Sequence, residues 1–306
     1  MRASRCSKVA GGILAMLTAV TGFAHAGLLA EWNFDSTTTN REYATYTKAG
    51  ISSVATLYGN ATSFVGTAFG AGGITPIQNN GLRLTNGYYT ANGGLYLNQI
   101  WSSIFGVGNF SNGTVMLVLK PDTSYSAAVR YWFFQHNDSG VNDSIGIYQL
   151  DGVSHGVGVV GGRGSENSFG VWTSSGPTWN TNDWYFIAGS WKQSSGSNGV
   201  LSGYGGYNGT TDGCATVYVR TMKQGLTGTL KPAGTTYTVT STNLMIWNTR
   251  LTGFNYYPYF GRRTNGDYSG SGDYALIRIY NEYMDAPQLA NLFDNLFIRG
   301  SSILFK

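Results

Sequence analysis

The fold of this chain is decided by the stretch GDYALIRIYN, residues 272–281, and by the segment MDAPQL, residues 284–289, which follows it. In the first stretch the side chains alternate, so that Ile277 and Ile279 share one side of a strand and Arg278 takes the other. Alternation with a period of two residues is typical of a β-strand in a sheet. The first stretch therefore predicts a strand over residues 274–281.

The second segment predicts the start of a helix. Asp285 is a good N-cap residue, and Gln288 stands three residues later, where it completes a capping box. Pro287 lies in the first turn, where its missing N–H costs little. Apolar residues then follow at helical spacing and form one stripe, namely Leu289, Leu292, Phe293, Leu296 and Phe297. We expect this helix to pack against the strands that precede it.

Upstream of this junction the chain reads as a series of short strands, each bounded by Gly, Asn, Asp or Ser. The expected strands are 28–34, 82–85, 114–120, 129–135, 144–149, 156–160, 168–173, 184–192, 215–222, 243–248 and 274–281. Long loop insertions are expected near residues 193–213 and 223–242. The predicted fold class is all-β, an antiparallel β-sandwich (jelly roll) with one short C-terminal α-helix.

Four segments resemble the LamG-like jelly-roll domains of the concanavalin A-like lectin and glucanase superfamily. The stretch 272–281 is similar to the closing strand of that family, and the segments 183–191, 216–220 and 28–35 are similar to earlier strands. The chain departs from the family pattern at Ala275 and Leu276, where an Asp-Glu pair is usual. The resemblance implies an architecture rather than a chemistry.

Residues 1–26 have the pattern of a secretory signal peptide. Basic residues come first, an apolar stretch from Val9 to about Val20 follows, and Ala24-His25-Ala26 forms a small-x-small cleavage site. The expected mature chain is a single domain, residues 27–306, which is secreted or held at the cell surface of a bacterium. Loss of three basic residues lowers the net charge from +4 to +1, so no nucleic-acid partner is expected. No later apolar stretch is long enough to span a membrane.

The composition is poor in charged residues and rich in glycine and aromatic residues. Charged residues make up 11% of the chain, against about 25% in typical domains, and there are 44 Gly, 21 Tyr and 8 Trp. A surface rich in Ser, Thr, Asn and aromatic groups suits extracellular polysaccharide or matrix contact. The same composition also suits a β-sandwich with many turns.

Catalytic signals are weak. Glycosidases need a pair of close carboxylates, but the four Glu residues after position 26, which are Glu31, Glu42, Glu166 and Glu282, are scattered. Gln135 and His136, together with Arg130 and Tyr131, could form the site of a polysaccharide lyase. We favour a secreted, non-catalytic carbohydrate-binding or adhesion module. The alternatives are a structural, self-associating surface or matrix protein and, third, a polysaccharide lyase or glycoside hydrolase.

Two sets of residues are the candidate sites. Aromatic side chains that could stack on sugar rings are Trp101, Tyr125, Trp132, Trp191, Tyr204 and Tyr207. Oxygen-rich loops that could hold a structural calcium contain Asp138, Asp143, Asp267 and Asp273. No cofactor is required by this interpretation, and the expected partner is an extracellular polysaccharide or a surface protein.

Overall fold

A computed structural model describes sixteen segments of the chain. They are residues 27–34, 41–43, 46–52, 54–58, 61–65, 80–84, 94–97, 112–122, 130–135, 144–150, 155–162, 169–195, 211–224, 230–244, 259–261 and 270–303. The expected leader and most of the insertion expected at 193–213 lie outside these segments. No helix among the described residues is long and apolar enough to cross a membrane.

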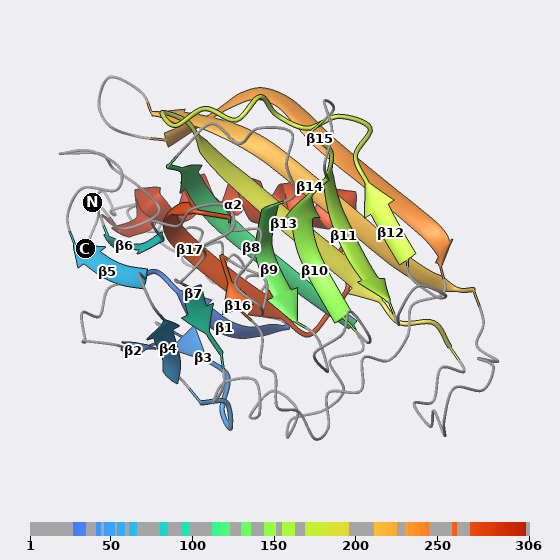
Figure 1. Ribbon diagram of the computed structural model, residues 1–306, viewed down its shortest axis with the longest axis horizontal. Coiled ribbons are helices and arrows are strands. Elements are labelled where there is room, and N and C mark those ends of the chain that lie inside the picture. The colour runs from blue at the N-terminus through green and yellow to red at the C-terminus, as the bar shows by residue number, and fades with distance from the viewer. Residues whose placement is uncertain are drawn as a thin grey trace, which may run out of the picture.

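The described strands form two antiparallel sheets that lie face to face (Figure 1). Sheet A has the order β15-β14-β13-β8-β17-β1-β3, with β6 paired to β17 and β5 paired to β6. Its strands are β15 (Leu230–Leu244), β14 (Gly213–Gln224), β13 (Trp184–Lys192), β8 (Asn112–Pro121), β17 (Gly272–Tyr280), β1 (Leu28–Trp32), β3 (Tyr46–Thr47), β6 (Asn80–Leu84) and β5 (Ala61–Val65).

Sheet B has the order β12-β11-β10-β9-β16-β7-β4-β2. Its strands are β12 (Phe169–Trp172), β11 (Val157–Gly162), β10 (Ser144–Gln149), β9 (Arg130–Gln135), β16 (Tyr259–Phe260), β7 (Gly94–Tyr96), β4 (Val54–Tyr58) and β2 (Arg41–Tyr43). Helix α2 (Ala286–Ile303) follows β17 and lies on the side of sheet A away from sheet B (Figure 1). The prediction of an antiparallel β-sandwich with a C-terminal helix is confirmed.

Sheet A separates two hydrophobic cores. The larger core fills the space between the sheets, and Ile277 and Ile279 of β17 belong to it. The smaller core lies between sheet A and α2, and Leu276 and Tyr280 of β17 belong to it. All nine residues of β17 are buried, so the alternation read from the sequence places two apolar faces in two different cores.

The helix begins as the capping box predicts. The backbone N–H of Gln288 donates to Oδ1 of Asp285 over 2.9 Å, and the backbone N–H of Asp285 donates to Oε1 of Gln288 over 2.9 Å. Of the expected stripe, Leu289, Phe293 and Leu296 are buried, whereas Leu292 is half-buried. The helix therefore docks through one face on the smaller core.

The prediction of a long loop insertion near residues 223–242 is wrong. Most of this segment is strand β15, which pairs with β14 along Leu230–Leu244. Of the strand expected at 243–248, the first two residues belong to β15, and residues 245–248 lie outside the described residues. Thr and Ser alternate there with Tyr237 and Val239, which are partly buried against the larger core. The polar composition of this segment suggests a loop. A half-buried edge strand can have the same composition, because threonine is β-branched and fits a pleated surface.

We expect the substitution Phe293→Ala to lower the free energy of unfolding by about 3–5 kcal/mol. The Phe293 ring packs against Phe186 with centroids 5.5 Å apart, and the Arg220 guanidinium carbon lies 4.9 Å from the ring centroid. Urea unfolding measures this loss of stability. The control is Asn291→Ala, a substitution at an exposed position of the same helix. Equal stability of Phe293→Ala and Asn291→Ala would show that α2 does not pack on sheet A.

Candidate functional site

The outward face of sheet B carries a row of aromatic side chains. Tyr131 of β9 pairs with Tyr148 of β10, Tyr148 pairs with Gly158 of β11, and Gly158 pairs with Trp172 of β12. Residues paired directly across neighbouring strands point to the same side of a sheet. Val159 and Val171, one position along in β11 and β12, lie in the core between the sheets. The aromatic row therefore faces away from that core.

Trp172 lies flat on a floor of two glycines. A Cβ atom on Gly158 would lie 2.2 Å from Cδ1 of the indole, and a Cβ on Gly170 would lie 1.9 Å from its Cη2. Any side chain at either position would push the indole off the sheet, and glycine in a strand often marks such a close approach. Among the described residues, Trp172 is the exposed large apolar side chain, with 38% of its surface accessible.

Tyr148 holds the indole in this position. Burial raises the pKa of the Tyr148 hydroxyl, and the hydrogen bond with the Trp172 side chain acts in the opposite direction. On its other side Tyr148 contacts Tyr131, with ring centroids 4.8 Å apart and ring planes at 32°. The three aromatic rings therefore form one continuous contact across β9, β10, β11 and β12.

The chain that follows Trp172 is also fixed. Thr173 donates its N–H to the carbonyl of Val157 over 3.0 Å, and its Oγ1 accepts from the N–H of Val157 over 3.0 Å. Further on, the Tyr185 hydroxyl accepts from the N–H of Asn180 over 2.8 Å and donates to the carbonyl of Thr178 over 3.2 Å. Burial raises the pKa of Tyr185 to about 12, so this hydroxyl stays protonated and keeps both bonds.

A second aromatic pair lies on the same face of sheet B. Tyr96 of β7 stacks on Tyr259 of β16 with centroids 4.7 Å apart and planes at 20°. Tyr259 pairs with Phe134 of β9. The β9 bulge lies between Phe134 and Tyr131, so it separates this pair from the row that Tyr131 begins. We call these five residues the aromatic face, namely Tyr96, Tyr131, Tyr148, Trp172 and Tyr259.

The part of the aromatic face that lies on β9 to β12 is uncharged. Where their side chains are described, the outward positions of these strands hold Tyr131, Tyr148, Trp172, glycines and Val160. A charged ligand would find no opposite charge there to replace its lost hydration. The chemistry of this surface is therefore stacking against flat rings, with backbone groups and the tyrosine hydroxyls as polar partners.

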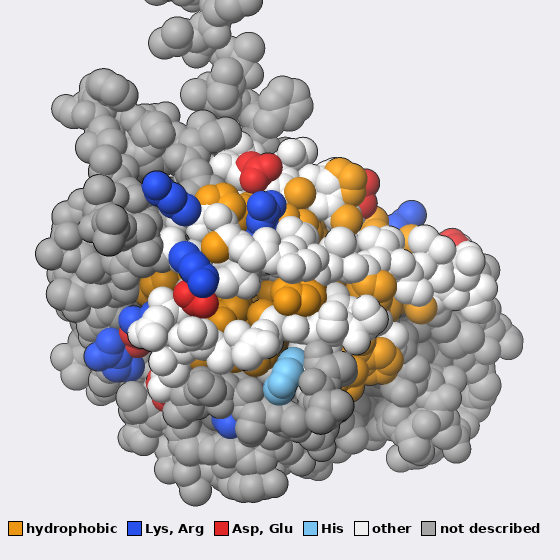
Figure 2. Space-filling view, turned by 90° about the horizontal axis from the view of Figure 1, so that it is seen from above, with side chains coloured by type: hydrophobic (Ala, Val, Ile, Leu, Met, Phe, Trp, Pro, Cys, Tyr) orange, Lys and Arg blue, Asp and Glu red, His pale blue; other side chains and the backbone are white. Residues whose placement is uncertain are grey.

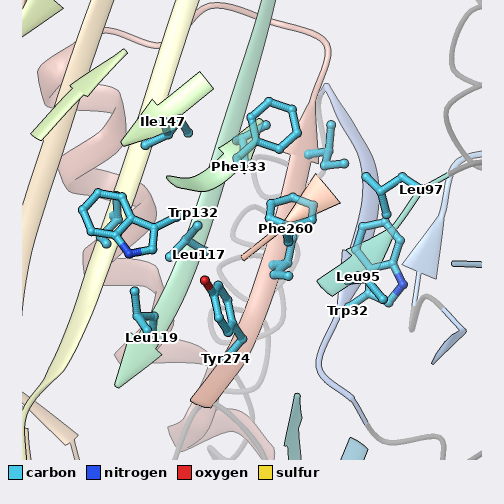
Figure 3. Close-up of a cluster of buried hydrophobic side chains, with 14 of the residues drawn as sticks. Trp32, Leu95, Leu97, Leu117, Leu119, Trp132, Phe133, Ile147, Phe260 and Tyr274 are labelled. Carbon is cyan, nitrogen blue, oxygen red and sulfur yellow. The ribbon is translucent and has the colours of Figure 1, made fainter. Parts of the chain in front are cut away.

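Two aromatic residues predicted to stack on sugars are core residues instead. Trp132 and Trp191 are 0% and 2% exposed. Figure 3 shows Trp132 among Leu117, Leu119 and Ile147 in the core between the sheets. A bulge between Ile147 and Tyr148 shifts the pairing of β9, and as a result Trp132 and Phe133, although adjacent in the chain, both point inward. This placement corrects the prediction for both tryptophans.

The remaining candidates are placed as follows. Trp101, Tyr125, Tyr204, Tyr207, Asp138, Asp143 and Asp267 lie outside the described residues. Asp273 lies in strand β17 rather than in a loop, and its two carboxylate oxygens accept from Arg83 over 2.7 and 3.0 Å. Lys120 Nζ lies 3.7 Å from the same carboxylate, so two cations surround the oxygens that we expected to bind calcium. The hydrogen bond to Asp273 raises the pKa of Arg83.

Two residues of the lyase interpretation, Arg130 and Tyr131, do not share a face of sheet B. Arg130 pairs with Gln149, whereas Tyr131 pairs with Tyr148, so the two neighbours point to opposite sides of sheet B. Arg130 is buried, Tyr131 lies on the aromatic face, and His136 is outside the described residues. Within the described part of the chain, no three His, Cys, Asp or Glu residues gather in a way that could hold a metal ion.

The sequence did contain a signal for Trp172. The sequence predicts a strand over 168–173, and Gly170 and Trp172 share one side of the strand observed at Phe169–Trp172. The sequence does not show that Gly158 of the neighbouring strand lies beside Trp172, where it completes the floor under the indole. Tyr96 and Tyr259 lie in strands of three and two residues, which are too short to show a period.

Comparison with known proteins gives distant similarities of fold. No family model and no curated protein matches the chain. Among solved structures, the CBM40 of the Ruminococcus gnavus IT-sialidase bound to α2,3 sialyllactose has a TM-score of 0.44 and 13% identity, covering 71% of this chain and 98% of that one. Domain 4 of a GH43 extracellular arabinanase from Geobacillus stearothermophilus, in complex with arabinotriose, has a TM-score of 0.45 and 16% identity, covering 87% and 98%.

A third similar structure is the binding domain of botulinum neurotoxin DC in complex with rat synaptotagmin II, with a TM-score of 0.47 and 12% identity, covering 88% of this chain and 51% of that one. Carbohydrate-binding β-sandwich modules are thus among the structural neighbours. Scores and identities this low carry no argument about function, which has to come from the aromatic face itself.

We expect Gly170→Val to lift the Trp172 indole from the sheet, because the new side chain needs the space that Cη2 occupies. The share of tryptophan fluorescence that iodide quenches should rise. In a Trp172→Ala background the same substitution should leave quenching unchanged, which serves as the control. Unchanged quenching in the otherwise native chain would mean that the indole does not rest on Gly170.

Proposed function

We propose that this protein is a secreted, non-catalytic carbohydrate-binding module of LamG-like architecture whose binding site is the aromatic face. The observation that carries the proposal is the flat Trp172 indole on its glycine floor. A ring that presents one open face suits the apolar face of a pyranose or furanose ring. Secretion rests on the pattern of residues 1–26 and is part of the proposal.

Fixed geometry favours binding at this site. Tyr148 and the two glycines hold the indole before a ligand arrives, so little side-chain entropy is lost on binding. Tyrosine and tryptophan combine a large apolar area with one polar group, which allows stacking and hydrogen bonding by the same residue. The row from Tyr131 to Trp172 crosses four strands, which lie about 4.8 Å apart, so it can contact more than one sugar unit of a chain.

We infer that the ligand is an uncharged polysaccharide. The described outward positions of β9 to β12 contain no charged residue. A sialic acid or a uronic acid carries a carboxylate, which would need a cationic or strongly hydrogen-bonding partner to offset its desolvation. A neutral glucan, xylan or arabinan makes no such demand.

Affinity electrophoresis in gels that contain neutral or acidic polysaccharides tests this proposal. We expect retardation by at least one neutral polysaccharide, and we expect Trp172→Ala to weaken that binding at least tenfold, or about 1.4 kcal/mol. Trp172→Phe keeps a stacking face and should retain more affinity than Trp172→Ala. Because the indole is partly exposed, both variants should unfold close to the native chain in urea.

Two results would contradict the proposal. Retardation that Trp172→Ala leaves unchanged would move the binding site away from the aromatic face. Binding only to acidic polysaccharides, such as alginate or polygalacturonate, would show that charge recognition rather than stacking determines the ligand.

A specific feature favours self-association as a second candidate function. Strand β15 is 15 residues long and stands at the edge of sheet A, where the described strands pair with one of its two sides. From Ala233 to Leu244 it contains no charged residue, and Thr235, Thr238, Thr240 and Thr242 are exposed. Figure 2 looks from the side where β15 runs in Figure 1 and shows broad uncharged areas with scattered charged side chains. An edge strand of this kind can pair with another strand.

If β15 joins two copies of the chain, the mass measured by sedimentation equilibrium should rise with concentration. Thr242→Lys places a charge on the exposed edge and should keep the protein monomeric. Ala49→Lys, at an exposed position next to β3 at the opposite end of sheet A, should behave like the native chain. A native chain that stays monomeric up to millimolar concentration would rule out this second function.

A further inference from the structure

Gly27 and Glu282 meet at the point where strand β1 begins. The carbonyl of Gly27 accepts from the N–H of Asn281 over 2.9 Å, which ties the first described residue to the end of β17. Gly27 has a φ of +80°, a conformation that glycine adopts without cost. A Cβ atom at Gly27 would lie 2.2 Å from Oε1 of Glu282. The carboxylate therefore rests against the backbone of Gly27, and the Gly27 nitrogen lies within roughly 5 Å of it by bond geometry.

Buried hydrogen bonds hold Glu282 in this position. Thr114 Oγ1 donates to the carbonyl of Glu282 over 2.7 Å, and the N–H of Met284 donates to Ser190 Oγ over 2.7 Å. Thr114 and Ser190 are both fully buried and bond to each other over 2.8 Å. The backbone on both sides of the Glu282 side chain is thus anchored to sheet A, which keeps the carboxylate within reach of Gly27.

The Glu282 carboxylate has no cation beside it among the described residues. The ion pairs of that part of the chain are made by Arg83 and Lys120 with Asp273 and by Arg278 with Glu31. Burial alone raises the pKa of Glu282, and neither Tyr283 nor Asp285, which stand next to it in the chain, contributes to that shift. In the folded chain the ionised form of Glu282 is therefore disfavoured. The fold loses stability as the pH rises from the ordinary pKa of a glutamate through the raised pKa of Glu282.

We propose that Glu282 is the binding site for the α-ammonium group of Gly27, which is created when the leader is removed after Ala26. Hydrolysis of the Ala26–Gly27 peptide bond by a leader peptidase consumes one water. Ala26 leaves with the new carboxylate, and Gly27 keeps the amine, which takes up a proton at neutral pH because its ordinary pKa is about 7.7–8.0. Before cleavage the same nitrogen is a neutral amide and offers the carboxylate no charge.

The proposed pair gives the processed chain a contact that the precursor lacks. It would join the start of β1, at the N-terminal end of the described chain, to the segment between β17 and α2. It would also lower the pKa of Glu282, so that ionisation stabilises the fold instead of weakening it. The position explains why residue 27 is glycine, since any side chain would occupy the space of the carboxylate.

A comparison of two forms of the chain tests the proposal at pH 7. One form begins at Gly27, and the other keeps Ala24-His25-Ala26 in front of it; all described residues are present in both. Glu282→Gln is introduced into each form, and thermal midpoints are measured. We expect Glu282→Gln to lower the midpoint of the form that begins at Gly27 by about 2–4 °C, and to leave the midpoint of the extended form unchanged or higher. Asp294→Asn, an exposed acid on α2, should act equally in both forms.

Acetylation of the Gly27 amine gives a second measurement that adds no residues. It should lower the midpoint of the native form and have no effect on Glu282→Gln. An equal effect of Glu282→Gln in the two forms would overturn the proposal. Mass spectrometry of exported protein should show a chain that begins at Gly27, and any other first residue would likewise overturn it. Neither result bears on the aromatic face, so failure here is distinct from failure of the proposed carbohydrate binding.

Discussion

The structure depends on the burial of strand β17 on both of its faces. A strand with one solvent face can tolerate polar residues at every second position, but β17 has to satisfy two cores at once. Its two charged side chains, Asp273 and Arg278, are both buried and both paired: Asp273 with Arg83, and Arg278, which is 8% exposed, with Glu31 on the neighbouring strand β1 over 2.5 Å. Burial lowers the pKa of Arg278, but Tyr280 and Glu31 outweigh that effect, so the guanidinium stays charged. An unpaired charge there would be costly.

A row of hydroxyl groups then attaches the helix to this sheet. Thr114, Ser190 and Thr216 lie side by side on β8, β13 and β14, and they bond to the chain between Glu282 and Met284. Buried hydroxyl groups need partners, and the irregular segment after β17 supplies them through its backbone and through the Tyr283 hydroxyl. The row fixes where α2 starts, and the capping box then fixes its first turn.

This arrangement also explains why the candidate site lies on sheet B. Sheet A has one face on the core between the sheets and the other on the core beneath α2. Among the described residues, the broad sheet face that lacks such a cover is the outward face of sheet B, which carries Trp172. Glycines at 158 and 170 contribute nothing to packing in the core, and the flat indole above them accounts for their presence in two strands.

The sequence by itself determined the elements whose local pattern is strong. It predicted the bounds of β10 and β13, the alternation in β17 and the capping box of α2, because apolar period and capping chemistry are local properties. Only the tertiary structure decided the direction in which each aromatic side chain points. One bulge in β9 turns Trp132 inward, and the floor beneath Trp172 combines glycines from two strands. Strand register is a non-local property, because it depends on which strands become neighbours, and the sequence of a single strand does not contain that information.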